Sequence, residues 1–140
     1  LESIKCLLKQ HKVVIAVGGG GIPVIEQENQ IVGVDAVIDK DLASSLLAQE
    51  LKLETFVILT DVESVKLNFG QAQETSISCL SVDTAEKYLC EGQFAVGSMA
   101  PKIQGAINFV KAGGKRALIT SFEQLKPALQ GKAGTVIRQN

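Results

Sequence analysis

The chain of 140 residues is predicted to adopt an α/β fold with three layers, in which a mainly parallel β-sheet lies between helices. Short apolar runs at 13–17, 55–60 and 115–120 have the length of strands. The segments between them repeat apolar residues at helical spacing, as helices that connect parallel strands do. Hydrophobic residues make up 46% of the chain and charged residues 21%, so we expect residues 1–140 to form a single globular domain.

The first third of the chain is expected to contain a helix at 2–11 and a strand at 13–17 that ends in four consecutive glycines. In 25–38, short β-branched runs alternate with polar residues, which favours an excursion of the chain or a small hairpin over a helix. Residues 41–51 predict a helix capped by Asp41. The apolar stripe expected to bury that helix consists of Leu42, Ala43, Leu46, Leu47 and Leu51.

The remainder of the chain continues the alternation of strands and helices. The uninterrupted apolar run 55–60 predicts a strand covered on both faces. A helix is expected to begin near Pro101 and to stop at the glycines 113–114, with Ile103, Ala106, Ile107 and Val110 on its buried side. The other expected elements are a helix at 82–91, a strand at 115–120, a short helix at 121–130 and a last strand at 134–137.

Composition excludes several classes of function. The net charge of −1 gives no electrostatic reason to expect a nucleic acid or membrane partner. No apolar run approaches the roughly 18 residues of a membrane-spanning helix. Three separated cysteines and one histidine do not form a familiar metal-ligand pattern, so no protein-bound metal site is expected. We expect the three thiols to be reduced, as in a cytoplasmic protein.

Four glycines, Gly18, Gly19, Gly20 and Gly21, follow the first predicted strand. Each glycine costs about 0.5–1 kcal/mol of chain entropy relative to alanine, so such a run needs a reason. Ligands of parallel sheets bind beyond the carboxyl ends of the strands, which is where this run lies. The sequence matches neither the dinucleotide fingerprint nor the P-loop. The run is therefore a backbone-lined anion site of another kind or a tight turn.

Two lysines lie at predicted helix starts, where a cation opposes the helix dipole by about 0.3–1 kcal/mol. Lys40 stands between Asp39 and Asp41, and Lys102 follows Pro101. An anion bound at the same helix ends would explain both lysines. This arrangement suggests a phosphoryl group clamped between two lysines that Asp41 holds in place. The alternative is a capping aspartate with solvated lysines.

Three further residues are candidates for a nucleotide site. Asp61 ends the strand 55–60 at the ligand edge and could accept from a ribose hydroxyl or join a magnesium shell, or it could simply start a turn. Phe69 and Met99 could flank a base, although single apolar residues often belong to the core.

The blocks GGGGIPV, AVIDKDLA, FVILTDV, GQFAVGSMAPK and GTVI, in this order over residues 13–136, resemble the carbamate kinases of the amino acid kinase family. The resemblance implies a C-terminal, nucleotide-binding lobe of a longer kinase, with the N-terminal lobe absent. It implies reversible phosphoryl transfer between ATP/ADP and carbamate/carbamoyl phosphate with Mg²⁺, and generation of ATP in arginine catabolism. Such kinases are cytoplasmic, and a homodimer is expected for the full-length protein.

The resemblance also assigns roles by position. Lys40 and Lys102 would stabilise the negative charge of the transferring phosphoryl group, and Asp41 would hold the two lysines in place. Asp39 would contact these residues without touching the ligand. The nucleotide would be lined by Asp61, Val62, Phe69, Gly97, Ser98 and Met99, and the small acceptor by Gly18, Gly19, Gly20 and Gly21. Two alternatives stay open at this point: another amino acid kinase with a different acceptor, and a non-catalytic remnant that binds nucleotide.

Overall fold

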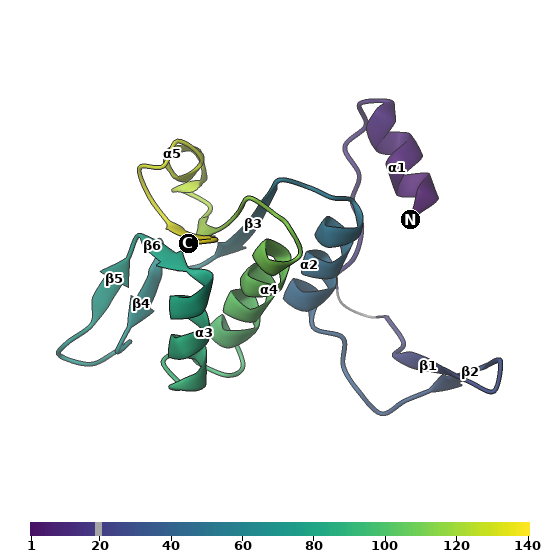
Figure 1. Cartoon of the computed structure of the whole chain (residues 1–140), viewed down its shortest axis with the longest axis horizontal. Helices are drawn as coiled ribbons and strands as arrows, with labels where there is room; N and C mark the ends of the chain where they lie inside the picture. Colours follow the sequence, from purple (N-terminus) through teal and green to yellow (C-terminus); the bar gives the residue numbers. More distant parts are fainter. Residues whose placement is uncertain (19–20) are drawn as a thin grey trace.

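The computed structural model describes residues 1–18 and 21–140 and has the α/β architecture that the sequence predicts (Figure 1). Its helices are α1 (Glu2–Lys9), α2 (Lys40–Glu50), α3 (Val82–Cys90), α4 (Met99–Lys111) and α5 (Leu125–Leu129). Its strands are β1 (Val24–Gln27), β2 (Gln30–Gly33), β3 (Thr55–Thr60), β4 (Val65–Leu67), β5 (Thr75–Ile77), β6 (Cys79–Ser81), β7 (Arg116–Ser121) and β8 (Thr135–Arg138).

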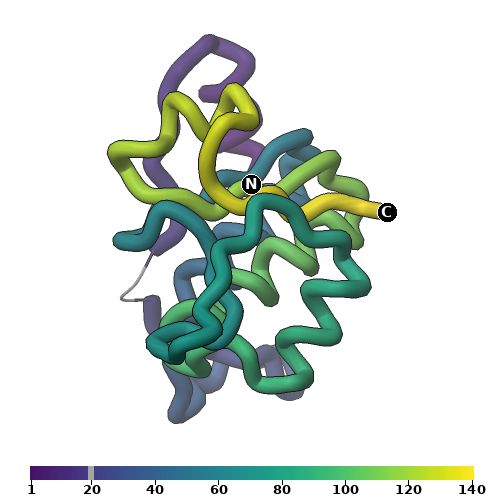
Figure 2. Tube along the Cα trace, turned by 90° about the vertical axis from the view of Figure 1, so that its left-hand side faces the viewer, coloured from purple at the N-terminus to yellow at the C-terminus, as the bar shows by residue number. Residues whose placement is uncertain are grey.

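The central sheet has four strands in the order β3-β7-β8-β6. Strands β3 and β7 are parallel, as are β6 and β8, whereas β7 and β8 are antiparallel. The sheet is therefore mixed. Helices α2, α3 and α4 lie on one side of it and α5 on the other, which gives three layers (Figures 1 and 2).

Helix α4 lies at the centre of the core, and its buried face is the predicted one. Ile103, Ala106 and Ile107 are fully buried and Val110 nearly so, because the apolar residues recur at intervals of three and four. The Phe109 ring of the same helix lies 5.5 Å from the ring of Phe56 on β3. The helix begins at Met99, two residues before the predicted start at Pro101.

Helix α2 is capped by Asp39 and not by Asp41, so that prediction was wrong. One carboxylate oxygen of Asp39 accepts hydrogen bonds from the backbone N–H groups of Asp41 and Leu42, at 2.8 and 3.0 Å. Two otherwise unpaired donors of the first turn are thereby satisfied. The side chain of Asp41, the second residue of the helix, is left available for other partners.

The predicted leucine stripe of α2 was also wrong as its buried face. The buried residues are Asp41, Ser45 and Ala48, while Leu46 is 58% exposed. The Ser45 hydroxyl donates to the backbone oxygen of Gly105 on α4 at 2.7 Å. A Cβ at Gly105 would lie only 3.1 Å from the backbone oxygen of Asp41. Small residues let the two helix backbones approach closely, and bulky leucines would not fit between them.

Residues 1–18 and 21–38 project from the body of the molecule (Figure 1). The hairpin predicted in 25–38 is present as β1 and β2. The predicted strand at 13–17 is not, because no described segment pairs with its backbone. Val13 and Ile15 are 95% and 98% exposed. Strand β3, predicted to be covered on both faces, is an edge strand that is mostly half-buried.

Three short strands, β4, β5 and β6, were not predicted, because three residues give too short a pattern to recognise. Strands β4 and β5 form an antiparallel hairpin beside the sheet. Helix α5 is shorter than expected. Within residues 1–18 and 21–140, no helix combines the length and the apolar character needed to cross a bilayer.

Thr135, which is fully buried on β8, fixes the hairpin of β4 and β5 to the sheet. Its hydroxyl accepts from the backbone N–H of Val65 at 2.8 Å and donates to the backbone oxygen of Ile77. Thr135→Val would leave a buried N–H without a partner. We expect the substitution to lower the free energy of unfolding in urea by about 1–3 kcal/mol. The exposed Thr75→Val is the control and should change it by less than about 0.5 kcal/mol. Equal effects would contradict this role of Thr135.

Candidate active site

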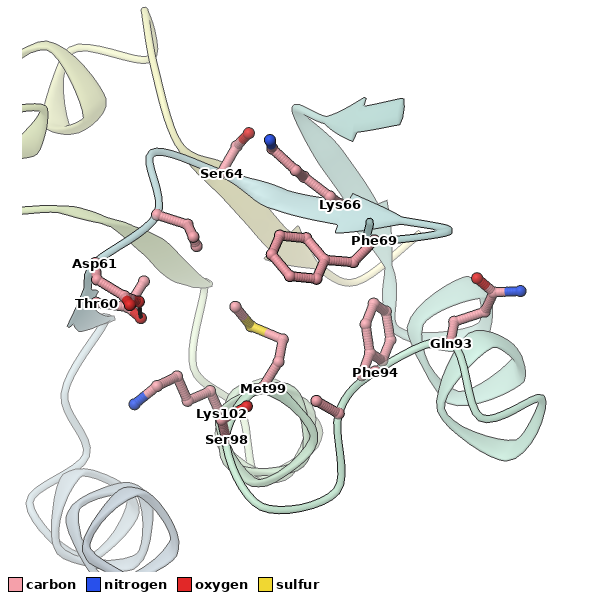
Figure 3. Close-up of a pocket in the computed structure, with 12 residues that line it drawn as sticks. Thr60, Asp61, Ser64, Lys66, Phe69, Gln93, Phe94, Ser98, Met99 and Lys102 are labelled. Atoms are coloured by element: carbon pink, nitrogen blue, oxygen red, sulfur yellow. Dashed lines mark hydrogen bonds between the residues drawn. The ribbon is translucent and has the colours of Figure 1, made fainter. Parts of the chain in front are cut away.

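A cavity of about 200 Å³ opens at the carboxyl end of β3, beside the first turn of α4 (Figure 3). This is the position where α/β sheets bind ligands. The residues that line it are Thr60, Asp61, Val62, Ser64, Lys66, Phe69, Gln93, Phe94, Ala95, Ser98, Met99 and Lys102.

The cavity has an apolar side and a polar end. Phe69, Phe94 and Met99 face one another across its middle (Figure 3). Thr60, Asp61 and Lys102 lie together at the other end. A ligand with a flat apolar group and an anionic group matches this division.

Lys102 and Lys40 share the carboxylate of Asp41. The Nζ atom of Lys102 lies 3.1 Å from Oδ2 and 3.3 Å from Oδ1 of Asp41, and the Nζ atom of Lys40 lies 3.3 Å from Oδ2. The side chains of Asp41 and Lys102 are only 10% and 14% exposed, whereas that of Lys40 is 61% exposed. A carboxylate so enclosed needs cationic partners to offset its desolvation. The three residues therefore form one charged cluster.

Two helix starts create this cluster. Asp41 lies in the first turn of α2 and Lys102 in the first turn of α4, and the close contact at Gly105 brings these turns together. The N-terminal ends of both helices carry a partial positive charge from unpaired N–H groups. Helix dipoles and lysines thus add to the same positive potential, which suits a bound anion.

The sequence profile of the amino acid kinase family matches residues 1–121. The chain belongs to this family. It is 56% identical to the carbamate kinase of Thermoplasma volcanium over 136 residues, which are 97% of this chain and 45% of that protein. It is 51% identical to the carbamate kinase of Thermoplasma acidophilum over 134 residues, 96% of this chain and 44% of that protein.

A similar solved structure is that of carbamate kinase from Giardia lamblia bound to AMP-PNP. The identity is 42% and the TM-score is 0.92, with 99% of this chain and 49% of that chain covered. The chain therefore spans less than half the length of the relatives it matches.

The structure brings together most of the residues that sequence reasoning assigned to an amino acid kinase site. Lys40, Asp41 and Lys102 form the cluster, and Asp39 lies behind it, with Oδ2 3.8 Å from the Nζ atom of Lys40. The predicted nucleotide residues that line the cavity are Asp61, Val62, Phe69, Ser98 and Met99. Gly97 does not line it. Ser98 precedes α4 without forming a capping hydrogen bond through its side chain.

The glycines predicted for the acceptor, as far as they are described, are not among the residues that line this cavity. Gly18 and Gly21 do not line it, and a Cβ at either would meet no atom within 4 Å. Gly19 and Gly20 lie outside the described residues. Their assignment to the acceptor stays a prediction.

Sequence reasoning missed half of the cavity lining. The missed residues are Thr60, Ser64, Lys66, Gln93, Phe94 and Ala95. Ser64 and Lys66 alternate with the fully buried Val65, a period of two that a strand places on one side. That short alternation was the feature of the sequence that could have pointed to Ser64 and Lys66. Gln93 and Phe94 follow α3 as a loop, which carries no pattern that points to a site.

Glu74 organises the hairpin that carries Phe69. Its two carboxylate oxygens accept from the Nζ atom of Lys66 at 2.6 Å and from the backbone N–H of Gly70 at 2.9 Å. The hydrogen bond from Gly70, followed by that from Lys66, lowers the pKa of Glu74 below its ordinary value of 4.5.

This lowered pKa predicts how the hairpin responds to acid. The stabilisation from Glu74 is complete above pH 4.5 and is lost as the pH falls through the lower pKa of the folded state. In an NMR titration, the amide signal of Gly70 should report a midpoint below pH 4.5, and Lys66→Met should raise that midpoint. A midpoint at or above 4.5 in the unchanged chain would contradict the two hydrogen bonds.

Proposed function

We propose that this chain is the nucleotide-binding lobe of a carbamate kinase, which transfers a phosphoryl group reversibly between ATP/ADP and carbamate/carbamoyl phosphate. The observation that carries the proposal is the cluster of Lys40, Asp41 and Lys102 beside the polar end of the cavity. The high identity to carbamate kinases over almost the whole chain supports the choice of acceptor.

The cavity suggests how the nucleotide binds. The base would lie between Phe69 and Met99, where flat apolar contact is available. The phosphates would extend to Lys102 and the N-terminal turn of α4. Asp61, at the end of β3, would accept a hydrogen bond from the ribose.

The chemistry needs little covalent help from the protein. The bond between the terminal phosphorus and the bridging oxygen of ATP breaks as a bond from that phosphorus to a carbamate oxygen forms. Lys102 and Lys40 would offset the negative charge that spreads over the transferring oxygens. Asp41 would hold the two ammonium groups at a fixed separation, so that no reorganisation is needed during the reaction.

Mg²⁺ fits the polar end of the cavity. This cation favours carboxylate and phosphate oxygens, and Asp61 supplies a carboxylate there whose Oδ1 accepts a hydrogen bond from the Thr60 hydroxyl at 3.0 Å. When bound with the nucleotide, Mg²⁺ would neutralise part of the phosphate charge.

Further parts of the proposal concern the longer protein. A second lobe would complete the acceptor site together with Gly18, Gly19, Gly20 and Gly21, and would cover the exposed apolar side chains of residues 1–38. The full-length enzyme would be a cytoplasmic homodimer that generates ATP during arginine catabolism.

Two alternatives make different predictions. Another amino acid kinase would use this nucleotide site with a different acceptor. A non-catalytic remnant would bind nucleotide without turnover, but the intact Lys40, Asp41 and Lys102 cluster counts against loss of catalysis.

The full-length protein should form ATP from ADP and carbamoyl phosphate, measured with a luciferase assay. Lys102→Ala should lower kcat by about 10²–10³, because one preorganised cationic donor is lost. The exposed Lys111→Ala on the same helix is the control and should leave kcat unchanged. A decrease of less than about threefold for Lys102→Ala would place the residue outside the reaction. ATP formation from acetyl phosphate in preference to carbamoyl phosphate would favour the different acceptor, and nucleotide binding without turnover would favour the remnant.

A further inference from the structure

A second hollow lies at the other end of β3, away from the candidate active site. It has a volume of about 660 Å³ and is lined by Glu54, Thr55, Ser78, Cys79, Lys115, Arg116, Gly131, Val136 and Arg138. Thr55 begins β3 and Thr60 ends it, so the two cavities are separated by the length of that strand. A six-residue strand spans about 17–20 Å, too far for one small ligand to occupy both.

Three cations and one anion line this hollow. Lys115 forms an ion pair with Glu54, its Nζ atom 2.7 Å from Oε1, so these two charges offset each other. Arg116 and Arg138 form no ion pair with any residue in the described part of the chain. The Nε atom of Arg116 donates one long hydrogen bond of 3.4 Å to the Thr55 hydroxyl. The hollow therefore carries an excess of two positive charges.

Arg116 and Arg138 lie at the same end of two neighbouring strands, β7 and β8. Ala117 on β7 pairs with Ile137 on antiparallel β8; Arg116 precedes Ala117 and Arg138 follows Ile137, so each arginine is the next residue beyond that pair. Two like charges on adjacent strands at this short separation in register repel each other. Ordinary sheet pairing thus gives no reason for two arginines here, whereas an anion between them would.

We propose that Arg116 and Arg138 form a binding site for a doubly charged phosphate group, free or carried by a small ester. Guanidinium groups match the oxygens of phosphate in pairs of parallel hydrogen bonds, and two of them balance its two charges. The hollow is larger than a phosphate ion needs and is open enough to accept the organic part of an ester. The site is separate from the nucleotide cavity and does not depend on the proposed kinase activity.

The test is an NMR titration of the ¹⁵N-labelled chain with inorganic phosphate, and separately with glycerol 3-phosphate, against sodium chloride of equal ionic strength. The amide signals of Arg116 and Arg138 should shift in a saturable manner with phosphate and not with chloride. Signals of Ser98 and Met99 report on the nucleotide cavity and separate the two sites. Tighter binding of the ester than of phosphate would identify a phosphorylated metabolite as the ligand, and equal binding would identify the free ion.

The double variant Arg116→Gln, Arg138→Gln should bind phosphate at least about tenfold more weakly, because two charge-assisted contacts are lost. Lys126→Gln, which removes an exposed lysine on α5, should bind as the unchanged chain does. Phosphate should raise the Tm of the unchanged chain but not that of the double variant. Without phosphate, the double variant should melt no lower, because a repulsion has been removed. Shifts that do not saturate in the unchanged chain, or that persist in the variant, would overturn the proposal.

Discussion

The enclosed carboxylate of Asp41 is the constraint on which the candidate site depends. A carboxylate with so little exposure is stable only beside cations, and Lys102 and Lys40 supply them. These contacts exist because α2 and α4 approach each other closely at Ser45 and Gly105, where even a Cβ at Gly105 would lie 3.1 Å from the backbone oxygen of Asp41. The close packing of α2 against α4 therefore also determines how the charges of Asp41, Lys40 and Lys102 are arranged.

The remaining parts of the site are attached to the same framework. Helix α4 contributes its buried face to the core and its first turn to the cavity, so the position of Lys102 is fixed by the packing of Ile103 and Ile107. The opposite wall of the cavity is formed by the β4–β5 hairpin. Thr135 attaches this hairpin to the sheet by hydrogen bonds, and Glu74 links Lys66 and Gly70 within it. Phe69 is the exposed end of that wall, so the apolar side of the cavity is less rigidly fixed than the charged end.

Sequence reasoning could predict the features that repeat along the chain. Local patterns predicted the apolar period of α4, the strands β3 and β7, and the pairing of lysines with Asp41. The buried face of α2 could not be predicted in this way, because small residues gain their role only from the partner helix. The segment 13–17 has the composition of a strand, but a strand also needs a neighbour, and none is present among the described residues. Five of the six missed lining residues lie in loops or in a three-residue strand, where position is set by tertiary contacts; the sixth, Thr60, ends β3.

The most direct test of the central claim is the affinity of the chain for MgADP, measured by calorimetry, in the unchanged form and with Asp41→Asn. If Asp41 holds Lys102 in position for the phosphates, the substitution should weaken binding by about tenfold, although it removes a negative charge near an anionic ligand. Combining it with Lys102→Ala should then add little, with a coupling of about 1 kcal/mol or more between the two positions. Circular dichroism would check that each variant is folded. Tighter binding by Asp41→Asn would contradict the account, since it would mean that the carboxylate merely opposes the ligand's charge.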